Sequence, residues 1–428
     1  MMASDPKDPR RLTEPKIVTI HLKRRVLVVL WILVVLPWLF VAILLMDRAS
    51  SRLQQAVSPA SNQPATGDMT ISKPGPWGTL ECKRIVLEPP DEYVDIHDAL
   101  PRGIRWFFIG KSRAEVENYL TTIGLSASEI ATLNGLWMEA ANGTYMQPPT
   151  NFVWNLSGDV RSRLYDFLSH SEENERQVAT YRYRADKLHE WFADSGLQTD
   201  TVQMVQALLY QRGTGLAFAD MDLVSPRLPN DTERLRLLSV LSRRAGLQVR
   251  LRIKEGTDVQ AIAEYWGIGG RDKDVLPILE SYARRDGGGN ISIYGLLPKF
   301  PRTLLNTYPL PTSDPTKLPR NCHWTSLNFF RDEPDDRMAT VEGATKEIIE
   351  NYYEIVGQPR LGDLIVFTDS AGAVIHSCVF IADDIVFTKN GTSMSAPWIL
   401  MSLADVSAYY TNSRELKIRM YRPKERLG

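Results

Sequence analysis

Cysteine and histidine are scarce in this sequence. Its 428 residues include three cysteines, Cys82, Cys322 and Cys378, and six histidines. Three cysteines are too few for a disulfide scaffold or a cysteine-rich zinc site, and an odd number leaves at least one thiol free or paired with another molecule. The sequence also lacks a His-Glu-x-x-His motif and a Cys-x-x-Cys pair, so we expect no metal and no cofactor. The pairings Cys322–Cys378 and Cys82–Cys378 both stay open.

An excess of charge of one sign is also missing. The 50 Lys and Arg residues balance 51 Asp and Glu, which gives a formal net charge of −1. A nucleic-acid-binding protein normally shows a basic excess, so we expect no nucleic-acid partner. The 43% of hydrophobic and 24% of charged residues are typical of globular protein and exclude wholesale disorder. At about 150 residues per domain, the length predicts about three folded units.

One long stretch without charge, residues 26–46, reads VLVVLWILVVLPWLFVAILLM. At about 1.5 Å per residue a helix of this length spans roughly 31 Å, the thickness of a bilayer core. Its length, after a start of 25 residues, favours an uncleaved transmembrane helix over a signal peptide. Seven Lys and Arg residues lie within residues 6–25 and two within 47–66. This asymmetry predicts that the basic tail, residues 1–25, is cytoplasmic and that the bulk is periplasmic or extracellular.

The composition then changes twice. Residues 47–81 are rich in Ser, Ala, Gln and Pro, which predicts a flexible tether. Residues 82–310 carry mostly helical signals, among them Ser-x-x-Glu capping boxes that begin at Ser112 and Ser126. We therefore expect a mainly helical domain, which either positions the next domain or recruits a protein partner.

Two segments inside this central region deserve separate predictions. Residues 172–192 show helical spacing, and their basic residues, Arg182, Arg184 and Lys187 among them, are expected on a solvated face. Residues 247–253, LQVRLRI, alternate with period two and predict a short strand. Prolines at 309–319 then indicate a passage into a third unit, residues 311–428.

This last unit begins with Asn321 and Cys322. Asn321 is a good N-cap, so Cys322 is expected in the first turn of a helix, where the helix dipole lowers the pKa of a thiol. Another predicted helix, at about residues 344–356, is followed by short apolar runs typical of strands, at 363–367, 373–382 and 385–388. Helices followed by an antiparallel sheet predict an α+β fold.

The order of the motifs resembles the NlpC/P60-type, papain-like cysteine peptidases over roughly the last 110 residues. The resemblance is carried by Cys322 at a helix start, by GDLIVF from Gly362 and by His376 at the start of HSCVFI. It implies a papain-like helix and antiparallel sheet in which Cys322 is the nucleophile and His376 the base. The chain departs from the family where His-Trp follows the cysteine in place of Ser-Gly, and where HSCVFI replaces the usual HVGIY.

The third polar residue of such a site is ambiguous here. Thr388, Lys389 and Asn390 all lie near the expected position. A neutral acceptor suits an imidazole better than a cation, so Asn390 is the first choice and Thr388 stays open.

Together these features predict a membrane-anchored cell-envelope cysteine hydrolase. By resemblance, its substrates are amide bonds in peptidoglycan peptides. Two alternatives remain: a non-catalytic envelope protein that binds wall peptides or a partner on a peptidase-like scaffold, and a thiol acyltransferase.

Overall fold

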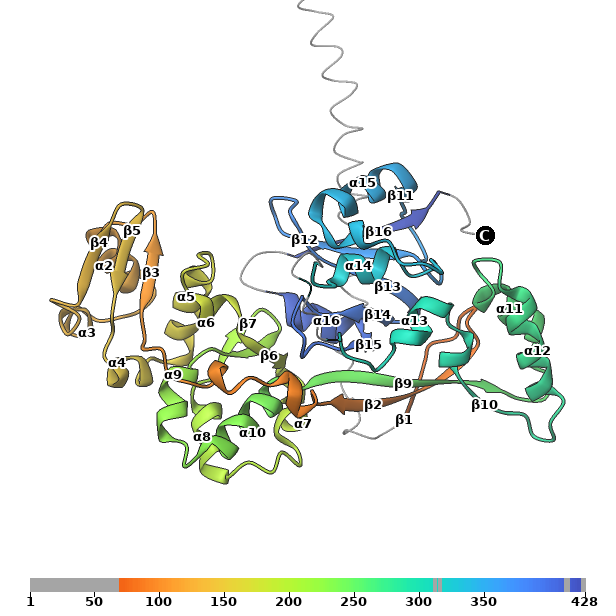
Figure 1. Ribbon diagram of the computed structural model, residues 1–428, viewed down its shortest axis with the longest axis horizontal. Helices are drawn as coiled ribbons and strands as arrows, with labels where there is room; N and C mark the ends of the chain where they lie inside the picture. The colour runs from red at the N-terminus through yellow and green to blue at the C-terminus, as the bar shows by residue number, and fades with distance from the viewer. Residues whose placement is uncertain (1–68, 311–313, 315–317, 412–415, 425–428) are drawn as a thin grey trace, which may run out of the picture. The chain divides into compact units, whose positions relative to one another are not determined.

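Antiparallel β-sheets organise the part of the chain that the structure describes (Figure 1). The structure is a computed structural model and describes residues 69–310, 314, 318–411 and 416–424, all within one compact unit. The strands of each sheet follow in their order across it. The four-stranded sheet consists of β1 (Met69–Ile71), β2 (Thr79–Leu87), β9 (Arg244–Ile253) and β10 (Gly289–Ser292), and the six-stranded sheet consists of β11 (Tyr352–Glu354), β16 (Lys417–Pro423), β12 (Leu364–Thr368), β13 (Val374–Ala382), β14 (Ile385–Lys389) and β15 (Trp398–Ser402). Two three-stranded sheets consist of β3 (Trp106–Ile109), β5 (Gly143–Met146) and β4 (Trp137–Ala140), and of β6 (Tyr181–Arg184), β8 (Gly215–Phe218) and β7 (Tyr210–Arg212).

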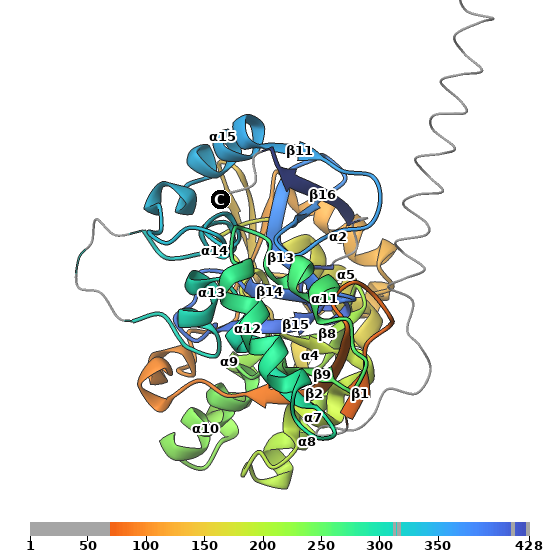
Figure 2. The same cartoon turned by 90° about the vertical axis from the view of Figure 1, so that its right-hand side faces the viewer.

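Helices connect and cover these sheets (Figure 2). The α-helices are α2 (Arg113–Thr122), α3 (Ala127–Ala131), α4 (Thr150–Trp154), α5 (Gly158–Leu168), α6 (Glu175–Val178), α7 (Leu188–Phe192), α8 (Thr199–Ala207), α9 (Met221–Val224), α10 (Asp231–Leu241), α11 (Val259–Trp266), α12 (Asp272–Ala283), α13 (Lys299–Leu304), α14 (Cys322–Leu327), α15 (Val341–Asn351) and α16 (Leu403–Tyr410). Short 3-10 helices are η1 (Asp91–Tyr93), η2 (Ile96–Asp98), η3 (Ala185–Lys187), η4 (Ser225–Arg227), η5 (Ile293–Leu296) and η6 (Asp336–Ala339).

The predicted α+β class is confirmed for the described residues. The predicted anchor, residues 26–46, lies outside them, and within the described ranges no helix is long and apolar enough to cross a membrane. The end of the predicted tether is folded instead, because β1 and β2 occupy part of residues 69–81. β2 pairs with β9 along its whole length, from Thr79↔Arg252 to Leu87↔Arg244, and this pairing orders the segment.

Helix is the commoner regular structure in residues 82–310, but β-sheets run through this region as well. Both predicted capping boxes are present, at Ser112 and Ser126, and residues 247–253 do form the end of β9. The predicted single helix at 172–192 was wrong, because the segment breaks into α6, β6, η3 and α7. Its Tyr-Arg-Tyr-Arg sequence alternates with period two and pairs with β8, which is strand behaviour.

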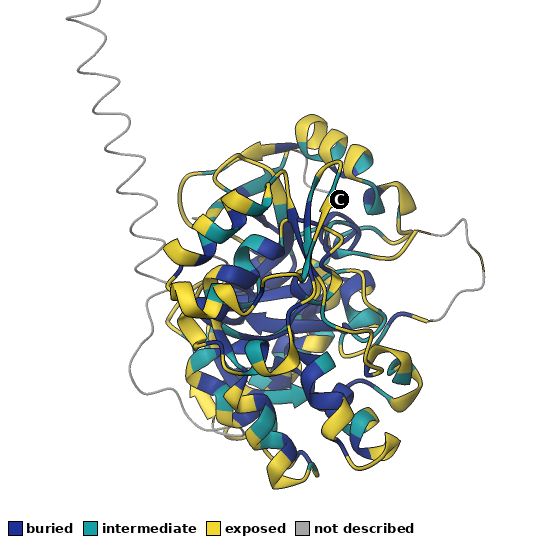
Figure 3. Cartoon of the chain, turned by 90° about the vertical axis from the view of Figure 1, so that its left-hand side faces the viewer, coloured by how far each residue is buried: buried dark blue, intermediate teal, exposed yellow. Residues whose placement is uncertain are grey.

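The six-stranded sheet carries the C-terminal elements (Figures 1 and 2). α14 packs on β13 and β14, and α16 packs on β15 and also on β6 of the central region. α15 ends at Asn351, earlier than expected, because the next residues form β11 and pair with β16. Figure 3 shows that buried residues gather in the interior and exposed ones on the outer helices and loops.

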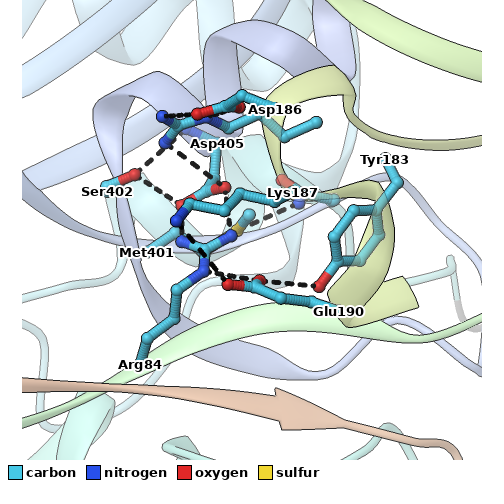
Figure 4. Close-up of polar contacts among 10 residues, drawn as sticks. Arg84, Tyr183, Asp186, Lys187, Glu190, Met401, Ser402 and Asp405 are labelled. Atoms are coloured by element: carbon cyan, nitrogen blue, oxygen red, sulfur yellow. Dashed lines mark hydrogen bonds and ion pairs between the residues drawn. The ribbon is translucent and has the colours of Figure 1, made fainter. Parts of the chain in front are cut away.

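A cluster of buried charges joins the central region to the six-stranded sheet (Figure 4). Arg84 of β2 donates from Nε to Glu190 of α7 at 2.7 Å, and from both terminal nitrogens to Asp405 of α16, at 2.6 and 2.8 Å. Arg184 and Lys187 lie beside these carboxylates, with Arg184 3.9 Å from Asp405. Arg184 and Lys187 are therefore buried within an ion-pair cluster, which corrects the expectation of a solvated face.

The cluster changes how Asp405 titrates. Burial alone would raise the pKa of this carboxyl, but the hydrogen bonds and positive charge of Arg84 outweigh burial and lower the pKa below its usual value. Ser402, the N-cap of α16, adds a further hydrogen bond to the same carboxylate at 2.5 Å. The first turn of α16 is thereby tied to both β2 and β15.

We expect Arg84→Met to destabilise the protein by about 3–5 kcal/mol, because it removes the hydrogen-bonded cation that the two buried carboxylates share. The measurement is the free energy of unfolding of the full-length chain in urea. The control is Arg102→Met, since Arg102 pairs with the exposed Asp98 and Glu175. Exposed pairs contribute about 0–1 kcal/mol, so equal losses for the two variants would contradict the role given to the cluster.

Candidate active site

Cys322 occupies the first position of α14, as predicted. The Asn321 side chain caps the helix: its oxygen accepts from the backbone N–H of Trp324 at 2.9 Å, and its amide donates to Ala339 O at 2.8 Å. Because α14 packs on β13 and β14, this cap holds the cysteine against the sheet.

The environment of the thiol differs from the expectation. Cys322 is 6% exposed, and burial raises its pKa above the ordinary value. Backbone hydrogen bonds from Ser377 and His323, and the positive charge of Lys389, act in the opposite direction but do not outweigh burial. The predicted lowering of this pKa by the helix dipole was therefore wrong: loss of solvent exceeds the stabilisation of the thiolate by nearby N–H groups.

His376 lies on β13 and is fully buried. Its Nε2 is 3.0 Å from Oγ1 of Thr388, and its ring stacks on Tyr410 at 4.0 Å with an angle of 17°. Nδ1 has no hydrogen-bond partner among the described residues. Burial, and then the charge of His323, hold the pKa of His376 well below its usual value, so the imidazole is neutral at pH 7.

The cysteine and the histidine meet at a single peptide group. The backbone N–H that bonds the sulfur belongs to Ser377, so it is part of the amide that joins His376 to Ser377. The Ser377 side chain faces α14, with Oγ 2.8 Å from Nδ1 of His323 and 2.7 Å from Oγ of Ser326. Within the described part of the chain, no hydrogen bond joins the side chains of Cys322 and His376. Because side chains alternate along a strand, His376 points to the face of β13 opposite Ser377, toward Tyr410 of α16. The thiol and the imidazole are therefore connected only through this peptide group, and both are in their neutral forms.

The residue that contacts the imidazole is Thr388. Asn390, the first choice from the sequence, lies beyond the end of β14, where its Oδ1 is 3.5 Å from Thr388 Oγ1 and its amide donates to Met401 Sδ at 3.2 Å. Asn390 therefore does not contact His376 itself but contacts Thr388, which contacts the imidazole. The physical reason is the alternation of side chains along a strand: β14 directs Thr388 toward His376 and the next residue to the other face.

That next residue, Lys389, is a fully buried lysine. Its Nζ donates to the carbonyl oxygens of Gly391 and Ser393, at 2.9 Å each, and lies 5.9 Å from the ring centroid of Trp398. No carboxylate pairs with it among the residues that the structure describes. Burial lowers its pKa to about 7, although the charge of Cys322 acts to raise it.

The Gly-Asp-Leu motif has a structural role. Gly362 has φ of +89°, and a Cβ there would lie 2.0 Å from the Phe330 ring, so glycine is required. Asp363 accepts from Arg422 of β16 at 2.9 and 2.6 Å and from the backbone N–H of Arg360 at 2.7 Å. The motif thus fixes the start of β12 against its neighbour β16.

All three cysteines, Cys82, Cys322 and Cys378, are free and buried. Neither disulfide left open by the sequence is present in the structure. Cys378 lies on β13 two residues beyond His376 and is completely buried, and burial raises its pKa well above the ordinary value.

Comparisons with known proteins add no assignment. No model of a protein family matches the chain, and no curated protein matches it either. The resemblance to NlpC/P60 peptidases therefore rests on the residues of the site themselves.

Sequence reasoning missed Tyr410, and it named Lys389 without expecting its burial. Tyr410 ends α16 and covers His376, and no local pattern connects two residues so far apart. Lys389 was set aside as a partner for the imidazole, but its charge acts on Cys322 instead. The position of Lys389 in an otherwise apolar strand, IVFTK, was the available signal for a buried cation.

We expect Lys389→Met to flatten the pH dependence of stability between pH 7 and 8.5. The unfolded chain keeps the proton on this lysine up to about pH 10, whereas the folded chain releases it near pH 7. The unfolded state therefore binds more protons in this window, and the free energy of unfolding rises by up to about 1.4 kcal/mol per pH unit.

Urea unfolding of the full-length chain at several pH values measures this slope. The matched control is Lys346→Met, because Lys346 is exposed on α15. If wild type and Lys389→Met have the same slope, the ammonium is not held in the folded state as described.

Proposed function

We propose that the protein is a membrane-anchored cell-envelope cysteine hydrolase that cleaves amide bonds, with peptidoglycan peptides as its substrate class. The observation that carries the proposal is the position of the Cys322 sulfur against the peptide between His376 and Ser377. Nε2 of His376 is already bound to Thr388, so Nδ1 is the nitrogen left to take a proton, and the proposed reaction requires it to turn toward the sulfur. Acyl transfer by a cysteine requires a nucleophile, a base and a group that orients the base, and Cys322, His376 and Thr388 are the candidates for these roles.

In the proposed reaction, Cys322 attacks the substrate carbonyl while His376 takes the thiol proton at Nδ1. The C–N bond then breaks, and His376 delivers the proton to the departing amine. Water hydrolyses the resulting thioester and regenerates the thiol. Thr388 holds the ring in position throughout, and backbone N–H groups at the start of α14 are available to the oxyanion.

Up to about pH 7, where it keeps its proton, Lys389 supplies positive charge beside the sulfur of Cys322. Its charge favours the ionised form of Cys322, and it has two carbonyl partners but no carboxylate among the described residues. A buried ammonium without an anionic partner is costly. Formation of the thiolate offsets part of this cost, so Lys389 favours ionisation even though burial opposes it.

A second candidate function is favoured by one observation. Cys322 and His376 are both buried, and the pKa of the thiol is raised rather than lowered. An inert thiol is what a non-catalytic binding protein on a peptidase-like scaffold would have. Such a protein would bind wall peptides without cleaving them.

We expect Cys322→Ala and His376→Ala each to lower kcat on peptidoglycan stem peptides by at least about 100-fold, the size of a general acid–base contribution. Thr388→Val should lower kcat and shift its pH profile, and Thr388→Ser should restore both, since the hydroxyl is what orients the ring. The matched control is Cys82→Ala, which removes a buried thiol of β2. Peptide binding without turnover, unchanged in Cys322→Ala, would favour the binding protein and contradict the hydrolase.

We also expect Cys322 to react slowly with iodoacetamide at pH 7, more slowly than free cysteine, because its pKa is raised and its sulfur is buried. Mass mapping of the labelled full-length chain across pH measures the rate. Peptide substrate should accelerate labelling in the wild type, and His376→Ala should abolish the acceleration. Fast labelling at pH 6 without peptide would contradict the neutral thiol described above.

A further inference from the structure

Arginines surround a small cavity beside α16. The cavity has a volume of about 20 Å³ and lies between β6, the start of β9 and α16. Four arginines line it, Arg182, Arg184, Arg243 and Arg244, and Asp405 is the one carboxylate in its lining. Asp405 is already bound through both oxygens to Arg84, so it has little capacity to neutralise the cavity.

The arginines differ in how their charge is balanced. Arg243 pairs with Glu88 at 2.7 Å, and Arg184 pairs with Asp186 at 2.6 Å. Neither Arg182 nor Arg244 has a carboxylate within 4.0 Å in the described part of the chain. Both reach only neutral acceptors: Arg182 donates to Thr180 Oγ1 and Tyr409 O, and Arg244 donates to two backbone carbonyls and, at 3.5 Å, to the Tyr409 hydroxyl.

Arg244 also has an unused donor. Arg244 as a whole is 8% exposed, and its buried Nε has no hydrogen-bond acceptor among the described residues. Arg182 and Arg244 both stack over the Tyr409 ring, at 5.7 and 5.1 Å from its centroid. Arg182 is half-buried, and a further guanidinium, that of the buried Arg212, is likewise held by neutral oxygens, of Gln177, Thr180 and Ser169. Buried charge of one sign is costly unless an opposite charge accompanies it.

The size of the cavity limits what can supply that charge. About 20 Å³ holds one water-sized or slightly larger body. A monatomic anion such as a halide is close to a water molecule in size and fits this space.

We propose that this cavity binds a single halide-sized monovalent anion between the guanidinium groups of Arg182 and Arg244. The negative charge can belong to an inorganic ion such as chloride, or to one carboxylate oxygen of a small ligand. The proposal rests on the arginines alone and does not depend on Cys322 being catalytic.

The solution test is urea unfolding of the full-length chain at constant ionic strength, with chloride replacing methanesulfonate. At a chloride concentration 100 times the half-saturating one, the unfolding equilibrium constant should fall about 100-fold. Arg244→Met and Arg182→Met should each remove this dependence. The matched control is Arg284→Met, since Arg284 is the exposed C-cap of α12 and pairs with Glu280, and it should keep the dependence.

Acetate in place of chloride distinguishes the sources. Stabilisation by chloride alone identifies an inorganic-ion site, and stabilisation by both identifies a site that also accepts carboxylates. Cys322→Ala should retain either response, so failure of the hydrolase proposal would not affect this one.

A measurement on the unmodified protein keeps the proposal testable if the variants fail to fold. Crystals of the full-length chain soaked in sodium bromide should show an anomalous peak between Arg182 and Arg244. A cavity without bromide, together with no chloride dependence of unfolding, would overturn the proposal.

Discussion

The arrangement of the described chain depends on how one buried positive charge is shared. Arg84 lies on β2, and its guanidinium is divided between Glu190 of α7 and Asp405 of α16. One carboxylate comes from the central region and the other from α16, which packs on β15 of the six-stranded sheet, so one side chain joins elements more than 200 residues apart. Because none of the three groups is exposed enough to be solvated, each depends on the other two.

This cluster also determines the geometry of the candidate active site. Asp405 lies in the first turn of α16, and Tyr410 ends the same helix and stacks on His376. A helix of eight residues is about 12 Å long and behaves as a short rigid rod. The ion pairs at one end of α16 therefore position the aromatic ring that covers the imidazole at the other end, and Thr388 fixes the imidazole from β14.

Features that depend on residues close in sequence could be predicted, and features that depend on distant contacts could not. The caps at Ser112, Ser126 and Asn321 involve residues three apart, and all three are present. β6 was missed although its four residues alternate with period two, because so short a pattern is ambiguous and the strand is stabilised by the distant β8 and by the ion pair of Arg184 with Asp405. The choice of Thr388 over Asn390, and the raised pKa of Cys322, likewise follow from the sheet that encloses them.

Cations without a carboxylate partner among the described residues lie in and near the candidate active site. Burial opposes ionisation of Cys322, and positive charge nearby acts against the effect of burial. Lys389 provides it, and it has no carboxylate partner among the described residues, while Arg182 and Arg244 repeat this pattern beside Tyr409. A carboxylate partner for Lys389 would neutralise the ammonium and cancel its effect on the sulfur. Because no carboxylate neutralises it among the described residues, the buried ammonium of Lys389 favours the thiolate form of Cys322, a negative charge that is absent while the thiol is neutral.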